Sequence, residues 1–191
     1  RIYEKLAVES ILNLTHETPL RLLEVGAGGG DLTWQLAPEL AGVGCEYYFT
    51  DIGRTFVTEA RKEAERRGLD FMRFEVLDIS KDPGRQGFAE KSFDVVLALN
   101  VVHATADVGQ TISQLRKILV PGGLICLVEL TKYHRWDNMI IGLADGWWFF
   151  KDAYRKNSPL LGMSEWERVF RDHGFDLIAF PANTAESGAD A

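Results

Sequence analysis

Apolar positions along the chain follow two periods, and together they predict strands separated by helices. Short, dense apolar runs predict five strands, at 20–25, 46–50, 70–77, 93–99 and 124–130. Apolar residues at helical spacing predict three helices between them, at 32–40, 55–67 and 108–119. Because strand and helix alternate through five strands, we expect an α/β fold with a doubly wound, Rossmann-like parallel sheet.

The rest of the chain departs from this alternation. Residues 2–14 have apolar positions at helical spacing and predict a leading helix. Residues 136–159 interrupt the pattern with glycines and aromatic side chains, which predicts a lid-like insertion. After it we expect a last helix at 164–171, with Ser164 as its N-cap, and a last strand at 175–180.

The two ends of the sequence suggest an excised domain. Residues 181–191 are small and turn-prone, so we interpret them as a linker-like tail after a core that covers residues 1–180. The first residue is Arg1 rather than methionine, and we expect the chain to be a piece of something longer.

Composition and charge exclude several classes of protein. The 191 residues are 46% hydrophobic and 26% charged, as in one ordinary globular domain. A net charge of −7 argues against nucleic-acid binding, which needs a basic surface. Apolar stretches such as 124–128 are much shorter than the ~20 residues of a membrane span, and the N-terminus has no signal-peptide pattern. We expect a cytoplasmic domain without a membrane partner.

Cysteine and histidine positions do not indicate a metal site. Cys45 and Cys126 lack the C-x-x-C spacing, so buried reduced thiols are the expected state. No cluster of histidine, cysteine and acidic residues has the spacing of metal ligands.

The stretch EVGAGGGD at 24–31 directly follows the first predicted strand and contains four glycines. In a doubly wound sheet this loop lies in the ligand crevice at the carboxyl ends of the strands. Glycines let the backbone turn tightly and approach a nucleotide-like ligand. The dinucleotide fingerprint G-x-G-x-x-G/A fails because Asp31 occupies its third small position. The pattern acid-x-G-x-G-x-G fits at Glu24, Gly26, Gly28 and Gly30.

Acidic residues end the next two predicted strands. Asp51 ends the second, where its carboxylate can accept hydrogen bonds from both hydroxyls of a ribose. Asp78 follows the third, at a position from which it can reach an adenine amino group. Either one alone could be a solvated turn residue or a helix cap. Together with the glycine loop they predict a site for an adenosine cofactor.

The fourth and fifth predicted strands bring a histidine and a carboxylate together. The fourth strand is followed by Asn100-Val-Val-His103, and the fifth by Glu129. These strands are neighbours in the usual order of this fold, so their carboxyl ends converge. A carboxylate beside a histidine fixes its tautomer and stabilises the imidazolium, which is what a general base needs. Alternatively, His103 caps the following turn and Glu129 is solvated.

Several stretches, in this order, resemble the C-methyltransferase domain of polyketide synthases, and NVVHAT and GWW are the most discriminating parts. The similarity covers roughly residues 20–178. The stretches are LRLLEVGAGGGDLTWQL, YYFTDI, FEVLDISKDPGRQGF, FDVVLALNVVHATADVGQT, LRKILVPGGLICLVELT, GWWFF and NSPLLGMSEWERVFRDHGFD. The glycine pattern is similar to motif I of S-adenosylmethionine-dependent methyltransferases.

The resemblance implies a class I methyltransferase whose N-terminal lid is largely absent from this chain. It implies S-adenosylmethionine as cofactor, with the backbone N–H of Ile79 serving adenine and Asn100 beside the methionine part. The methyl acceptor would be the α-carbon of a β-ketoacyl chain on the phosphopantetheine arm of an acyl carrier protein, with neighbouring synthase domains as further partners. His103 and Glu129 would form the catalytic dyad.

Three other functions are alternatives to carbon methylation. A His–Glu dyad can also deprotonate a hydroxyl, as in a small-molecule O-methyltransferase, and the domain could instead be an inactive scaffold within a synthase. Asp31 disfavours a nicotinamide dehydrogenase.

Two features of the insertion have open interpretations. The aromatic run Trp147 to Phe150 walls an acyl channel, sits near the cationic sulfonium, or belongs to the core. Basic residues near it form either a solvated face or a surface for an acidic carrier protein; they are Lys132, Arg135, Lys151, Arg155 and Lys156.

Overall fold

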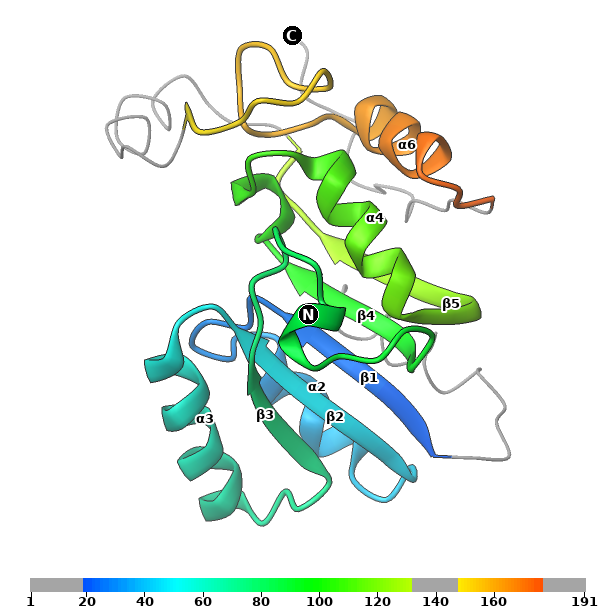
Figure 1. Cartoon of the computed structure of the whole chain (residues 1–191). Coiled ribbons are helices and arrows are strands. Elements are labelled where there is room, and N and C mark those ends of the chain that lie inside the picture. Colours follow the sequence, from blue (N-terminus) through cyan, green and yellow to red (C-terminus); the bar gives the residue numbers. More distant parts are fainter. Residues whose placement is uncertain (1–18, 132–147, 177–191) are drawn as a thin grey trace, which may run out of the picture.

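The computed structural model describes residues 19–131 and 148–176. Its centre is a five-stranded sheet in the order β3-β2-β1-β4-β5, in which every neighbouring pair is parallel (Figure 1). The strands are β1 (Leu20–Val25), β2 (Cys45–Asp51), β3 (Met72–Val76), β4 (Phe93–Leu99) and β5 (Leu119–Val128). The expected doubly wound, Rossmann-like sheet is confirmed.

Helices cover both faces of this sheet. They are α2 (Thr33–Leu40), α3 (Arg54–Arg67), α4 (Val108–Ile118) and α6 (Met163–Asp172), with short 3₁₀ turns η1 (Gly84–Gln86) and η2 (Val102–Ala104). Apolar residues of α2 and α3 pack with one set of strand residues, and those of α4 and α6 with the other. The strand order reverses between β1 and β4, which places the expected ligand crevice at the carboxyl ends of these strands.

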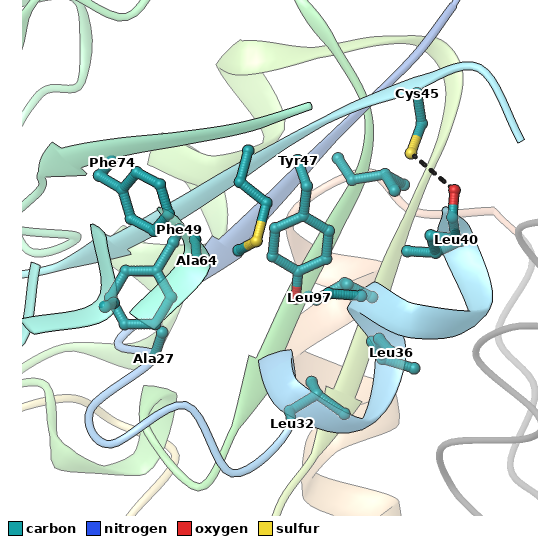
Figure 2. Close-up of a cluster of buried hydrophobic side chains, with 14 of the residues drawn as sticks. Ala27, Leu32, Leu36, Leu40, Cys45, Tyr47, Phe49, Ala64, Phe74 and Leu97 are labelled. Carbon is teal, nitrogen blue, oxygen red and sulfur yellow. Dashed lines mark hydrogen bonds between the residues drawn. The ribbon is translucent and has the colours of Figure 1, made fainter. Parts of the chain in front are cut away.

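Alternating strand residues explain how the two cores form. Leu22 and Val95 face α2, whereas Leu23 and Val96 face α4, and all four side chains are fully buried. Such strands are apolar on both faces, as expected for the middle of a parallel sheet. Figure 2 shows the core on the side of α2, where the Sγ of Cys45 lies 3.9 Å from the carbonyl of Leu40. Both cysteines are free thiols; Cys45 is buried as predicted, whereas Cys126 is only partly buried.

Two predicted element boundaries are wrong. Leu119 does not end α4, because it pairs with Phe93 as the first residue of β5. The register then shifts, so that Leu124 pairs with Val95 and the intervening Pro-Gly-Gly lies within the strand. Ser164 is not an N-cap, because α6 begins at Met163 and the Ser164 hydroxyl donates to Glu165 at 3.1 Å.

Some expected elements lie outside the described residues. These are the leading helix at 2–14, most of the last strand at 175–180, the tail, and the first part of the insertion. Within the described ranges no helix is long and apolar enough to cross a membrane.

Candidate active site

The glycine loop after β1 adopts a backbone that needs glycine. Gly26 and Gly28 have φ values of 59° and 53°, in the left-handed region that other residues rarely adopt. A Cβ on Gly26 would lie 2.1 Å from Cγ2 of Val101, whereas a Cβ on Gly28 would meet nothing within 4 Å. Gly26 therefore permits close packing against the segment after β4, and Gly28 lines open space that a ligand can enter.

Hydrogen bonds tie this loop to the end of β2. The backbone N–H of Gly28 donates to Oδ2 of Asp51 at 2.9 Å, and the N–H of Ala27 donates to the carbonyl of Thr50 at 3.0 Å. The Thr50 hydroxyl donates to the carbonyl of Glu24 at 2.7 Å. The loop and Asp51 are thus held as one unit, as a shared binding site requires.

The Glu24 side chain lies beneath the loop and is only 1% exposed. Its Oε2 accepts hydrogen bonds from the hydroxyls of Thr33 and Tyr47, the latter at 2.7 Å. Burial, reinforced by the charges of Asp31 and Asp51, raises the pKa of Glu24 to about 7 despite these hydrogen bonds. Glu24 therefore joins β1, β2 and α2 beneath the loop rather than facing the open space. Thr33 and Tyr47 were not predicted as partners of Glu24, because nothing in the sequence around either residue indicates a hydrogen bond to this carboxyl group.

Asp51 stands at the carboxyl end of β2 beside the loop. Its Oδ1 accepts the N–H of Gly53 at 2.7 Å while Oδ2 accepts that of Gly28, and each carboxylate oxygen has a second lone pair for a ligand hydroxyl. The next residue, Ile52, is 66% exposed, so a large apolar side chain is open to solvent one position after this carboxylate. Ile52 was not among the predicted site residues, although an isoleucine directly follows the acidic end of the second predicted strand.

Asp78 follows β3 at the same edge of the sheet. Oδ1 accepts the N–H of Ser80 at 3.0 Å, and Oδ2 pairs with Nζ of Lys81 at 2.9 Å. Burial opposes ionisation, but these contacts outweigh it and lower the pKa of Asp78. The side chain of Ile79 is 7% exposed and packs in the core, so only its backbone can serve a ligand. Each carboxylate oxygen of Asp78 therefore already has one partner and one lone pair left for a ligand. The residue lies at the same edge of the sheet as Asp51, which ends β2.

Asn100 occupies a strained position between β4 and η2. Its φ is +51°, a conformation that asparagine tolerates better than most residues. Its N–H donates to the carbonyl of Val128 at 2.7 Å, and its Oδ1 accepts the N–H of Leu130 at 3.0 Å. Asn100 thus joins the ends of β4 and β5 on both sides of Glu129.

His103 and Glu129 are in direct contact. Nδ1 of His103, in η2, lies 2.5 Å from Oε2 of Glu129, the first residue after β5. Oε1 of Glu129 accepts the N–H groups of Val101 and Val102, at 3.1 and 2.7 Å. A carboxylate can only accept at these contacts, so Nδ1 carries the proton and Nε2 is the nitrogen that can take one. The predicted convergence of the two strand ends on this pair is confirmed.

Both side chains of the dyad are largely shielded from water. The His103 side chain is 13% exposed and that of Glu129 is 3% exposed. Low exposure strengthens a charge-assisted hydrogen bond, because little water competes for it. Glu129 is therefore not the solvated residue of the alternative interpretation.

The structure corrects the interpretation of Arg155 as part of a solvated basic face. Its side chain is fully buried, pairs with Asp152 at 2.6 Å, and donates to backbone carbonyls next to the dyad. The neighbouring basic residues Lys151 and Lys156 are exposed, whereas Lys132 and Arg135 lie outside the described residues. The pattern of charges alone gave no sign that one member of this group is buried.

The aromatic run at 147–150 has three residues that the structure describes, and they differ in exposure. Trp148 and Phe149 are 48% and 59% exposed, so these two side chains do not belong to the core. Phe150 lies beneath the guanidinium of Arg155, whose Cζ is 5.2 Å from the ring centroid. Trp147 lies outside the described residues. Among the residues that the structure describes, no group of histidine, cysteine and acidic side chains could hold a metal ion.

Comparison with known proteins agrees with this geometry. Residues 23–125 match a family described as a methyltransferase domain. The non-reducing polyketide synthase ausA of Penicillium brasilianum is 35% identical over 171 residues, which are 88% of this chain and 7% of that synthase. This chain therefore spans a small part of the length of that relative.

Solved structures extend the similarity. The crystal structure of the CurJ carbon methyltransferase is 38% identical, with a TM-score of 0.85 over 97% of this chain and 50% of that one. The trans-methyltransferase CalH, solved in complex with SAH, is 34% identical, with a TM-score of 0.78 over 91% of this chain and 48% of that one. The chain belongs to the methyltransferase domain family and is similar to the C-methyltransferase domains of polyketide synthases.

Proposed function

We propose that this domain transfers a methyl group from S-adenosylmethionine to the α-carbon of a β-ketoacyl thioester carried by an acyl carrier protein. The observation that carries the proposal is the contact between His103 and Glu129 at the carboxyl ends of β4 and β5, beside the glycine loop. In the proposed reaction His103 is the general base and Glu129 orients it.

The dyad is suited to removing a carbon-bound proton. Glu129 holds the proton on Nδ1, so Nε2 is the nitrogen of His103 that would accept the α-proton. As that proton arrives, the imidazolium forms next to a carboxylate, which stabilises the positive charge. The α-carbon of a β-ketoacyl thioester is acidic enough for a neutral imidazole because the negative charge of the enolate spreads onto two oxygens. A positioned base of this kind contributes ~10²–10⁴-fold to the rate.

The residues of the crevice fit an adenosine cofactor. Asp51 offers a lone pair on each carboxylate oxygen for a ribose hydroxyl, and Ile52 offers an exposed apolar surface for the face of a purine. Gly28 keeps open space beside the loop, and Glu24 supports the loop from beneath. Asp78, the backbone of Ile79, and Asn100 complete the proposed set. When bound, S-adenosylmethionine supplies an electrophilic methyl group on a positively charged sulfur.

We further propose that the acceptor reaches the site on the phosphopantetheine arm of an acyl carrier protein, within a larger synthase. The synthase ausA, of which this domain matches 7%, supports the presence of neighbouring domains. The exposed Lys151 and Lys156 lie in the segment that packs next to η2, where positive charge would favour an acidic carrier. Trp148 and Phe149, in the same segment, offer exposed apolar surface for an acyl chain.

The test uses a β-ketoacyl thioester and a panel of phenols as competing acceptors, with mass spectrometry to locate the added methyl group. We expect methylation at the α-carbon of the thioester. His103→Ala should lose ~10²-fold or more in kcat while the Kd for S-adenosylmethionine stays within a few-fold. His173→Ala is the matched control, because His173 contacts Ser113 on α4 at 2.7 Å rather than Glu129.

Methylation of phenols alone would overturn the proposed carbon acceptor in favour of an O-methyltransferase. Failure to bind S-adenosylmethionine in calorimetric titration would favour the inactive scaffold. Equal loss of cofactor binding in His103→Ala and in Asp51→Ala would contradict the separate roles given to these two residues.

A further inference from the structure

The segment that begins at Lys151 is joined to the segment that carries His103. The N–H of Lys151 donates to the carbonyl of Ala106 at 2.7 Å, and Oδ2 of Asp152 accepts the N–H of Val108 at 3.1 Å. These contacts link chain positions more than 40 residues apart, directly beside the dyad. The segment after Lys151 is therefore anchored next to the turn that carries His103.

Arg155 makes the contacts that reach His103 itself. Its Nη1 donates to the carbonyl of His103 at 2.6 Å, and its Nη2 donates to the carbonyl of Thr105 at 2.7 Å. The side chain is fully buried. A planar guanidinium can serve two carbonyls at once because its N–H donors are fixed in a fork. Arg155 therefore spans the C-terminal half of η2 and the residue that follows it.

Asp152 holds Arg155 in this position. Oδ2 of Asp152 accepts from Nε and Nη2 of Arg155, at 2.9 and 2.6 Å. Oδ1 accepts the N–H groups of Tyr154 and Arg155, so the carboxylate is itself fixed by the local turn. The ring of Phe150 covers the guanidinium on one side. Burying a charge in this way is costly unless the charge is paired and hydrogen-bonded, and here it is both.

The turn that carries His103 is short. η2 has only three residues, and 3₁₀ turns have poorer hydrogen-bond geometry than α-helices. Glu129 fixes the imidazole ring from β5, and Arg155 fixes the carbonyl of the same residue from the other side. The imidazole and the carbonyl of His103 are thus each held by a separate hydrogen bond.

We propose that Arg155, held by Asp152, is a positioning residue for methyl transfer, which fixes the backbone of His103 so that the imidazole remains aligned on Glu129. The proposal rests on the proposed function of His103 as general base. Arg155 does not touch the reacting atoms, and it acts only through the geometry of His103.

The test compares Arg155→Lys, Arg155→Met and the control Arg171→Met. Lysine keeps a positive charge opposite Asp152 but cannot donate in a fork to two carbonyls and a carboxylate. Arg171 forms an exposed ion pair with Glu167 at 2.7 Å, so its replacement removes an arginine away from the dyad. If Arg155→Met does not fold, Arg155→Lys alone still tests the proposal.

Three quantities are measured on each variant: kcat for the β-ketoacyl thioester, the Kd for S-adenosylmethionine, and the NMR resonance of the Nδ1 proton of His103. That resonance is identified by its absence in His103→Gln. For Arg155→Lys we expect a cooperative melt, a Kd within a few-fold of the original, kcat lowered roughly 10- to 100-fold, and a weakened or lost Nδ1 resonance. Arg171→Met should change none of these.

If Arg155→Lys has the same kcat and the same Nδ1 resonance as the original chain, the proposal is overturned. A positive charge opposite Asp152 would then be enough to position His103 without the two hydrogen bonds to backbone carbonyls. An unchanged kcat in His103→Ala, together with loss of the resonance in Arg155→Lys, would overturn the general-base function while supporting the positioning of the ring by Arg155. The two failures are therefore distinguishable.

Discussion

Replacing Glu24 with glutamine is expected to make the stability of the domain less dependent on pH. Glu24 is 1% exposed and lies beneath the glycine loop, where its Oε2 accepts two hydroxyl hydrogen bonds. Glutamine has nearly the same shape and an oxygen that can accept the same hydrogen bonds, but it does not ionise. The substitution therefore removes the titration of this position and preserves most of its packing.

The sign of the effect follows from the pKa values. Burial raises the pKa of Glu24 to about 7 in the folded chain, from an ordinary value of 4.5. Between these values the unfolded state binds fewer protons than the folded state, so the free energy of unfolding falls as the pH rises. The stabilising contribution of protonated Glu24 is complete below pH 4.5 and is lost as the pH rises through about 7.

The magnitude follows from the same difference. At about 1.4 kcal/mol per unit of pKa, the full contribution is about 3 kcal/mol. Most of it, about 2 kcal/mol, is lost between about pH 5 and about pH 8. The original chain should therefore lose about 2 kcal/mol more than Glu24→Gln over this range.

The assay is urea unfolding of both proteins at several pH values, with Glu59→Gln on the exposed face of α3 as the matched control. Titrations at other positions contribute equally to both proteins and cancel in the difference. Parallel pH profiles for the original chain and Glu24→Gln would refute the assignment of a raised pKa to this carboxyl.

Three further substitutions test the glycine loop and the proposed ribose contact of Asp51. Gly26→Ala should destabilise the domain by about 2–4 kcal/mol, since its Cβ meets Val101 and its φ is positive, whereas Gly28→Ala should cost only about 1 kcal/mol of backbone strain. Urea unfolding compares the pair, and equal losses would argue against the close approach at Gly26. Asp51→Asn should raise the Kd for S-adenosylmethionine about 10-fold or more in calorimetric titration, with a smaller change in kcat at saturating cofactor. An unchanged Kd would remove Asp51 from the cofactor site.

Local patterns predicted the elements that contain most of the site. The apolar run at 93–99 is long enough, and apolar enough on both faces, to be recognised as a buried strand, and β4 has these same bounds. The glycine motif marked a loop whose positive φ values require glycine at Gly26 and Gly28. His103 and Glu129 are 26 residues apart, and the expected pairing of the fourth and fifth strands predicted that they would lie together.

The features that sequence reasoning missed depend on long-range contacts. Leu119 has helical spacing from Leu115, and only its pairing with Phe93 shows that it begins β5. Arg155 lies among other basic residues, so its charge suggested a solvated face. It is buried because Asp152 and two backbone carbonyls about 50 residues away accept all its hydrogen bonds, and no local pattern reports such partners.

The most direct test of the central claim is exchange of the α-proton of the acceptor. A β-ketoacyl thioester is incubated in D₂O with the domain and S-adenosylhomocysteine, which fills the cofactor site without donating a methyl group, and deuterium at the α-carbon is followed by mass spectrometry. We predict exchange above the buffer rate for the original chain and exchange at the buffer rate for His103→Ala. Equal exchange by both proteins would contradict the assignment of His103 as the base.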